Sequence, residues 1–378
     1  GFTHNFAAST SQRASVMDYP HPQFELNNGE IEFANAYDTG IGEWDKVTVK
    51  YSYSDIPEGI EEREYLNKVL EDARLDGLKF ISDSDARSSG GAHAFAHLWD
   101  NGTDAAEELE RVLEIRKKAI ENFSKDNIRT NEAYSVLEDV FVPLYFFHRY
   151  QTEAAVKLVG GLEYNYAVKG GGENTVKHLD GKLQEKALES ILKTLSAEVL
   201  AIPEEKLELF PPRAFGYSRD RESFKSNADV AFDALGGPAT ASDMTMGLLF
   251  HPARAERLVQ QKAQNKDLPG LEYVLDQTIQ KTIKREVKDE YRNSVQNTIN
   301  FVVFKHLLDL AVNDESTPMV KAIVNQHIDE LANWLRGRKD AVSAEMYRNI
   351  RQFREKPEEF KLEINVPKIP DGSPIGSY

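Results

Sequence analysis

The 378-residue sequence contains no cysteine. This absence excludes disulfides, thiolate metal ligands and a cysteine nucleophile, but it fits both a reducing cytoplasm and a bacterial envelope protein built without bridges. Long apolar runs are also absent: stretches such as residues 300–308 are far shorter than the roughly 20 residues needed to cross a bilayer. The sequence therefore predicts no membrane span, and cysteine usage does not decide the compartment.

Positive charge is scarce as well. Lys and Arg number 46 against 62 Asp and Glu, which gives a formal net charge of -16. This charge would repel a phosphate backbone, and no cluster of Lys or Arg is dense enough to overcome the repulsion locally. The glycines at 90, 91 and 170–172 lack the spacing of phosphate-binding or dinucleotide-binding loops. We therefore expect neither nucleic acid nor a nucleotide cofactor as a partner.

The sequence does have 40% hydrophobic residues, enough for a sizeable core, and helical periodicity over much of its length. We predict a mainly α fold with little β structure. Residues 1–57 are rich in Gly, Pro, Asn and aromatics, 58–356 are helical, and 357–378 form an extended tail. The predicted helices cover 104–123, 131–158, 182–195, 221–234, 239–250, 252–264, 271–281, 285–312, 317–336 and 341–354. One β-hairpin is predicted from the alternation in 162–168, next to the three glycines at 170–172.

The first 20 residues carry a pattern with chemical content. Gly1 and His4 form GxxH within GFTHNF, and residues 15–20 follow as SVMDYP. Together they resemble the second half of the active site of metzincin zinc peptidases, whose motif is HExxHxxGxxH followed by a Met-turn. No HExxH occurs in the sequence. By this resemblance, the other two histidines and the glutamate base are expected directly before Gly1.

The resemblance implies a role for each of three residues. His4 would be the third zinc ligand, Met17 the hydrophobic floor beneath the zinc-binding histidines, and Tyr19 the group that reaches the zinc or the oxyanion. The alternatives are a loop histidine without a metal role for His4, and a buried aromatic with a satisfied hydroxyl for Tyr19. Residues 42–53 lie where the last helix of a metzincin catalytic domain belongs. We expect a helix there, although their alternation of apolar residues is also typical of a strand.

Further stretches resemble the long zinc-dependent metallopeptidases of Bacteroidetes and related bacteria: THNFAAS, YDTGIGEWDKVTVKYSY, HLWDNG and AIPEEKLELFPPR. This resemblance implies that residues 1–57 are the C-terminal remnant of a metzincin catalytic domain, followed by a large helical domain. In the full-length parent it implies zinc, hydrolysis of a peptide or protein substrate, and a periplasmic, outer-membrane-associated or secreted location. Without its N-terminal catalytic segment, the chain is expected to be inactive. Asn5 differs from the residue that follows the histidine in the better-known branches, so no substrate preference is carried over.

A second group of histidines lies in the stretch HAFAH. His93 and His97 are four residues apart and could share a helix face as a metal pair, with Asp83 or Asp85 as a carboxylate ligand. Ala94 stands where a zincin requires glutamate, however. The alternative is that both histidines form local hydrogen bonds.

Two other histidines, His148 in LYFFHRY and His327 on an apolar helix stripe, are expected to be packed core residues. Two functions besides the peptidase stay open: a non-enzymatic helical binding or scaffold domain, and a separate metal-binding module at His93 and His97. The gene sequence before residue 1 would discriminate, because HExxH there favours the peptidase and its absence favours the scaffold.

Overall fold

The computed structural model describes residues 2–169 and 176–370. Within these ranges helices dominate, and the only sheets are two antiparallel two-stranded ribbons, so the mainly α prediction is confirmed. One ribbon pairs β1 (Glu25–Asn27) with β2 (Glu30–Glu32), and the other pairs β3 (Leu162–Tyr164) with β4 (Val176–His178). The second ribbon is the predicted hairpin, although the glycines at 170–172 lie outside the described residues.

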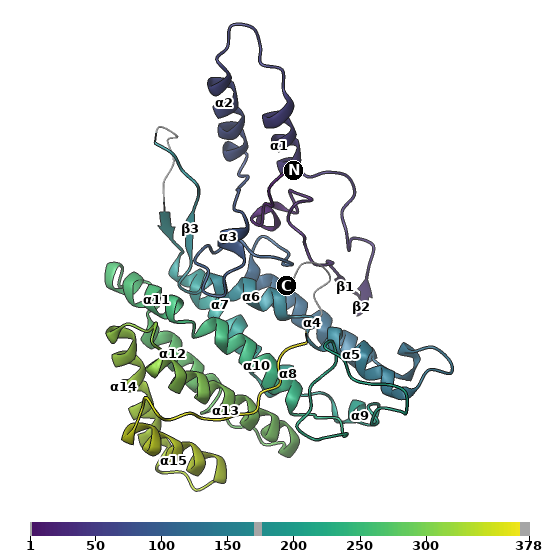
Figure 1. Cartoon of the computed structure of the whole chain (residues 1–378), viewed down its shortest axis with the longest axis vertical. Helices are drawn as coiled ribbons and strands as arrows, with labels where there is room; N and C mark the ends of the chain where they lie inside the picture. Colours follow the sequence, from purple (N-terminus) through teal and green to yellow (C-terminus); the bar gives the residue numbers. More distant parts are fainter. Residues whose placement is uncertain (1, 170–175, 371–378) are drawn as a thin grey trace.

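A narrow arm projects from a broad helical body (Figure 1). The arm is the helical hairpin of α1 (Glu43–Tyr53) and α2 (Glu62–Leu75). Helix α1 confirms the helix expected in this region. Its first turn is fixed by the Asp45 carboxylate, which accepts from Gly42 N at 2.7 Å, and this cap favours a helix over the strand that the apolar alternation permits. The domain boundary expected near residue 57 falls in the turn between α1 and α2.

The body packs its helices around one large hydrophobic core. At its centre α13 contacts α8, α10, α14 and α15 and is buried along most of its length, so its sequence has no distinct polar face. None of the described helices is both long and apolar enough to span a bilayer. The body helices are α3 (Asp83–Ala86), α4 (Ala105–Asn122), α5 (Leu137–Tyr145), α6 (Arg149–Leu158), α7 (Gly181–Lys193), α8 (Ala197–Leu200), α9 (Glu204–Leu207), α10 (Gly236–Leu249), α11 (Pro252–Gln264), α12 (Leu271–Lys281), α13 (Glu290–Val312), α14 (Pro318–Leu335) and α15 (Ala341–Glu355).

The single helix predicted over 131–158 is instead broken between α5 and α6. In a continuous helix the Tyr145 carbonyl would accept from Arg149 N. That carbonyl accepts from Arg116 Nε at 2.7 Å, and Arg149 N bonds to Phe146 O at 3.0 Å. The break therefore coincides with a long-range hydrogen bond to the Tyr145 carbonyl.

The helix predicted over 221–234 is wrong, because this segment is irregular. The Asp233 carboxylate accepts from Asn227 N at 2.8 Å, and such local side-chain bonds compete with helical ones. Phe232 stacks on Phe210 with ring centroids 4.4 Å apart. Aromatic packing therefore holds this loop against the body without helical structure.

Residues 357–370 contain no helix or strand and follow the body as an extended strap. The Pro367 carbonyl accepts from Thr240 Oγ1 at 2.9 Å, and Phe360, Leu362 and Ile369 pack against the main core. These contacts attach the strap to the body.

Candidate functional site

His4 is held in place by the backbone and side chain of its neighbour Asn5. Asn5 N donates to the Met17 carbonyl at 3.2 Å. The buried Asn5 side chain donates to the Lys79 carbonyl at 2.8 Å and accepts from Ile81 N at 3.2 Å. Asn5 therefore fixes the His4 segment between residues 15–20, where the resemblance implies a Met-turn, and the chain that leads into α3. Residues 15–20 are called the Met-turn below.

A small second core supports this segment. The Phe6 carbonyl accepts from His97 N at 3.2 Å, and Asn101 Nδ2 donates to the His21 carbonyl at 2.8 Å. Contacts of Asn5, Phe6 and His21 thus attach this segment to residues 79–101, as the ordering of such a segment requires. The buried residues of this core are Phe6, Ala7, Ile81, Ala86, Ala96 and Leu98.

The His4 ring contacts a carboxylate on one side and a phenol on the other. Its Nδ1 lies 2.8 Å from Asp83 Oδ2, and its Nε2 lies 3.0 Å from the Tyr19 hydroxyl. A carboxylate only accepts, so Nδ1 carries a proton, and in the neutral ring the lone pair of Nε2 accepts from Tyr19. The structure thus brings His4 and Tyr19 together. It also places Asp83 here, although Asp83 was expected as a ligand beside His93 and His97.

Asp83 begins α3 and is itself held by hydrogen bonds. Arg87 Nε donates to Asp83 Oδ1 at 2.8 Å. Burial acts to raise the pKa of Asp83, but the hydrogen bonds from Arg87 and His4 outweigh it and hold the pKa below its ordinary value. Asp83 is therefore ionised at neutral pH and is a fixed acceptor for His4.

Tyr19 has a backbone conformation that is unusual for an aromatic residue. Its φ is 60°, in the left-handed region, which costs an L-residue free energy and is enriched at functional sites. Its ring centroid lies 4.9 Å from that of His4, and the residue is 40% exposed. The Tyr19 hydroxyl therefore faces His4 from a position at the molecular surface.

The Met-turn is clamped by the first turn of α1. The Asp45 carboxylate accepts from Ser15 Oγ at 2.7 Å and from Val16 N at 3.0 Å. Ser15 Oγ in turn accepts from Met17 N at 3.0 Å. The partly buried Met17 is thus fixed from α1, and its carbonyl holds the His4 segment through Asn5.

Replacement of Gly42 by alanine should separate α1 from the Met-turn. A Cβ at Gly42 would lie 2.0 Å from the Ala14 carbonyl oxygen, a backbone atom that cannot rotate away. We expect Gly42→Ala to lower the free energy of unfolding by about 1–3 kcal/mol in urea titrations. Gly247→Ala is the matched control, because a Cβ there has only the His306 ring nearby, at 3.7 Å. Equal stabilities of the two variants would contradict this prediction.

Two carboxyl groups are buried in this region: Asp18 within the Met-turn and Asp100, at 1% and 5% exposure. Asp100 accepts from Ser9 Oγ at 3.2 Å. Burial raises the pKa of Asp100 from 3.8 to about 7, although the hydrogen bond from Ser9 acts to lower it. Burial, followed by the charge of Asp100, raises the pKa of Asp18. Burial therefore favours the protonated forms of both Asp18 and Asp100.

His93 and His97 do not share a helix face, because their segment contains no helix. His93 Nε2 donates to the Tyr164 carbonyl at 2.8 Å, and its Nδ1 accepts from Phe95 N at 3.1 Å. His97 Nε2 lies 3.3 Å from a carboxylate oxygen of Glu153. Both nitrogens of His93 are engaged by backbone, so we do not propose a metal pair here.

The remaining candidates are placed as follows. Asp83 bonds to His4, and Asp85 accepts from the Tyr166 hydroxyl at 2.7 Å, so neither carboxylate turns to His93 or His97. His148 is fully buried, and burial lowers its pKa well below the ordinary value, as expected for a packed core histidine. His327 is also buried, at 5% exposure.

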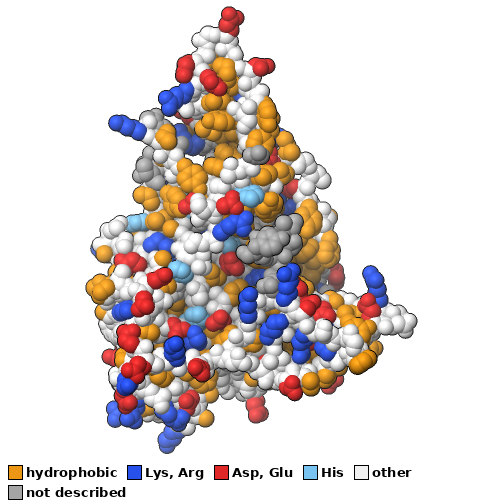
Figure 2. Space-filling view, viewed as in Figure 1, with side chains coloured by type: hydrophobic (Ala, Val, Ile, Leu, Met, Phe, Trp, Pro, Cys, Tyr) orange, Lys and Arg blue, Asp and Glu red, His pale blue; other side chains and the backbone are white. Residues whose placement is uncertain are grey.

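Apolar side chains are exposed on the arm and in the N-terminal segment that contains His4. Figure 2 shows hydrophobic side chains gathered on the upper part of the molecule, over the arm. Among the exposed apolar residues, Phe2, Val16 and Tyr53 are 41%, 54% and 75% exposed. Apolar side chains that gather on an exposed surface mark an interaction site.

The geometry agrees with one finding from comparison with known proteins. No curated protein and no solved structure matches the chain significantly. The sequence pattern of a protein family described as Met-zincin matches residues 1–290, which contain the arm and the His4 site. The name implies zinc binding by members of the family. Since the match covers most of the sequence, the chain belongs to the Met-zincin family.

Proposed function

We propose that the chain provides the third zinc ligand, the Met-turn and the oxyanion-stabilising tyrosine of a peptidase that hydrolyses peptide or protein substrates. The observation that carries this proposal is the His4 ring, whose Nδ1 donates to Asp83 and whose Nε2 faces the Tyr19 hydroxyl. A metal-ligating histidine usually donates its other ring N–H to a carboxylate or carbonyl, and this bond fixes its tautomer and orientation. The donor set at His4 therefore fits a zinc ligand.

Each residue of the His4 site would have a separate role. His4 would hold the metal through Nε2, while Asp83 keeps the proton on Nδ1 and fixes the ring. Tyr19 would donate a hydrogen bond to the oxyanion formed at the scissile carbonyl. Bound zinc would supply Lewis acidity toward water and carbonyl. Two further histidines and a glutamate base would come from a segment that carries HExxH, and this segment is the main partner we propose.

The exposed apolar surface supports such a partner. A segment that brings two histidines to the metal held by His4 would approach the exposed side of Tyr19, and Phe2 and Val16 of the same N-terminal segment are also exposed. Burial of these side chains would contribute about 25 cal/mol per Å² of apolar area removed from water. The first test is the gene sequence before residue 1: HExxH there supports the proposal, and its absence overturns it. The periplasmic, outer-membrane-associated or secreted location implied by the resemblance is part of this proposal.

Replacement of Asp83 by asparagine should weaken zinc binding in a polypeptide that joins an HExxH segment to this chain. Asparagine keeps the shape but loses the charge that favours the Nδ1–H tautomer of His4. Loss of such a partner typically lowers metal affinity by about 10–100-fold, which competition with a chromogenic chelator would measure. Asp85→Asn is the control, because Asp85 bonds to tyrosines and not to His4. An affinity equal to that of Asp85→Asn would show that Asp83 does not orient the ligand.

A further inference from the structure

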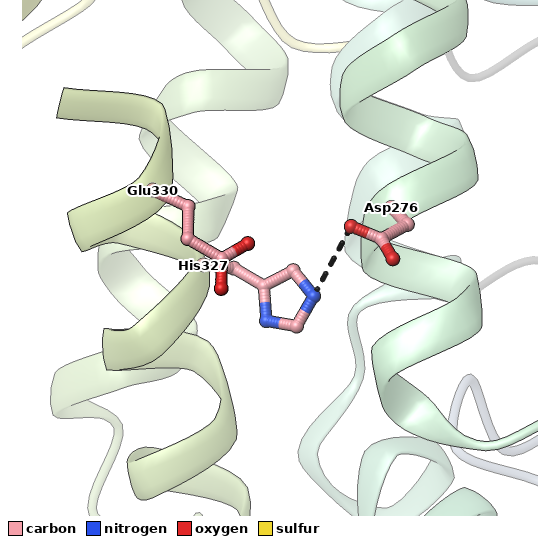
Figure 3. Close-up of side chains that lie close together, drawn as sticks. All are labelled: Asp276, His327 and Glu330. Atoms are coloured by element: carbon pink, nitrogen blue, oxygen red, sulfur yellow. Dashed lines mark ion pairs between the residues drawn. The ribbon is translucent and has the colours of Figure 1, made fainter. Parts of the chain in front are cut away.

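Helix α14 presents a second group of metal-ligating side chains, far along the chain from His4. His327 and Glu330 are three residues apart and therefore lie on one face of α14. Helix α12 packs against α14 and brings Asp276 opposite them (Figure 3). One ligand atom from each of the three side chains lies within 4.8 Å of the others. One nitrogen and two carboxylate oxygens thus converge between two helices.

The His327 ring is fixed with a lone pair directed into this cluster. The residue is 5% exposed, and its Nδ1 lies 2.8 Å from the Ile323 carbonyl, which only accepts. Nδ1 therefore carries a proton, and Nε2 of the neutral ring is an acceptor. This Nε2 lies 3.4 Å from Asp276 Oδ1, another acceptor. The two atoms attract each other only when a cation, either a proton on Nε2 or a metal ion, lies between them.

Both carboxylates lack a basic partner. Within residues 2–169 and 176–370, no lysine or arginine forms an ion pair with Asp276 or Glu330. One oxygen of Glu330 accepts from Gln326 Nε2 at 3.0 Å, which leaves its other oxygen available. The Asp276 side chain is 59% exposed, so it can rotate and water can reach the cluster. The cluster is thus a solvent-accessible site with two uncompensated negative charges.

We propose that Asp276, His327 and Glu330 bind one divalent transition-metal ion that links α12 to α14. Imidazole suits Zn²⁺, Fe²⁺ and Ni²⁺, whereas Mg²⁺ and Ca²⁺ prefer oxygen ligands throughout, so the single nitrogen favours the first group. The Ile323 carbonyl has the orienting role that a backbone acceptor has at many metal-bound histidines. Bond lengths near 2.0–2.2 Å require the exposed carboxylates to close toward the fixed ring nitrogen. Asp276 lies within the family match, which ends at residue 290, whereas His327 and Glu330 lie beyond it. The site shares no residue with the His4 site, so it is tested separately from the proposed peptidase function.

The test uses Co²⁺, whose visible absorption reports nitrogen and oxygen ligands. The chelator-treated chain carrying His4→Ala is titrated, so that His4 contributes no ligand. We expect one Co²⁺ per chain, competition by Zn²⁺, and a higher urea midpoint when metal is present. Loss of an orienting partner alone costs about 10–100-fold in affinity, so Asp276→Asn and Glu330→Gln should each weaken binding at least about tenfold. Both carboxylates are exposed, and these variants are expected to fold.

The control is a similar pair for which the described part of the chain offers no third ligand. His306 Nε2 lies 2.8 Å from Asp243 Oδ1 across α13 and α10, and Asp243→Asn should leave Co²⁺ binding unchanged. Loss of binding in Asp276→Asn and Glu330→Gln but not in Asp243→Asn supports the site. The proposal is overturned by the absence of binding at about 1 mM Co²⁺. It is also overturned by binding that survives both carboxylate changes, since His327 and Asp276 would then share only a proton.

Discussion

Replacement of His4 by alanine should abolish peptide hydrolysis by a polypeptide that joins an HExxH segment to this chain. A catalytic zinc site uses three protein ligands, and His4 would be one of them, held by Asp83 at 2.8 Å. We expect kcat/KM on a peptide library to fall at least about 1000-fold, which corresponds to about 4 kcal/mol of transition-state stabilisation. Zinc content, measured in parallel, should fall with it. The 378 residues alone should hydrolyse no peptide, because a single imidazole cannot hold the metal in a defined geometry.

The control for this experiment is His178→Ala. His178 is exposed on β4, and its replacement should leave activity unchanged. Undiminished activity after His4→Ala, or activity of the 378 residues alone, would contradict the assignment of His4. Activity that depends on His4 but persists after zinc removal would contradict the metal chemistry.

A binding or scaffold protein is the rival function. It would use the same exposed apolar surface of the arm, but it would need no HExxH segment and no zinc. An HExxH-bearing polypeptide that binds zinc and cleaves none of the peptides would favour this rival. The proposal of a peptidase rests on the contact between the Tyr19 hydroxyl and His4, which a scaffold would not require.

The sequence indicated candidate residues that lie close together in the chain, and their roles in a zinc site stay predictions. His4 and Tyr19 are 15 residues apart, and the structure places their side chains within hydrogen-bond distance. The helix at α1 was also predicted, because its place after the Met-turn outweighed the strand-like alternation of its apolar residues. Both predictions depended on short distances along the chain and on the resemblance to metzincins.

Asp83 could not be assigned in the same way. It lies 79 residues from His4, and the whole arm separates them in the chain. Proximity in sequence suggested His93 and His97 as its partners, but His93 bonds to backbone and His97 lies beside the Glu153 carboxylate. Asn5 gave no signal either, because its role depends on carbonyl and N–H groups of residues 79–81 that no sequence pattern identifies. Contacts between residues that precede the arm and residues that follow it can be assigned only from the folded structure.

The sequence also does not show whether an acidic side chain is buried. Among the buried acids, Asp100 has the largest expected effect on stability. Its pKa is about 7 in the folded chain and near 3.8 when unfolded. The folded state therefore keeps a proton that the unfolded state releases, so the contribution of Asp100 is most favourable below about pH 4 and is lost as pH rises to about 7. A shift of this size corresponds to at most about 4 kcal/mol, because coupling to Asp18 distributes it over the pair.

Asp100→Asn should therefore stabilise the chain at alkaline pH. Asparagine removes the ionisable group but keeps an acceptor for Ser9 Oγ, which lies 3.2 Å from Asp100 Oδ2. Near pH 8 we expect the variant to exceed the parent by about 2–4 kcal/mol in the free energy of unfolding by urea, and this difference should shrink toward about pH 4. The exposed Asp314→Asn is the control and should change stability by no more than about 0.5 kcal/mol. The prediction is contradicted if the difference in unfolding free energy between Asp100→Asn and the parent does not vary with pH. Asp18 and Asp100 would then both be charged in the folded chain.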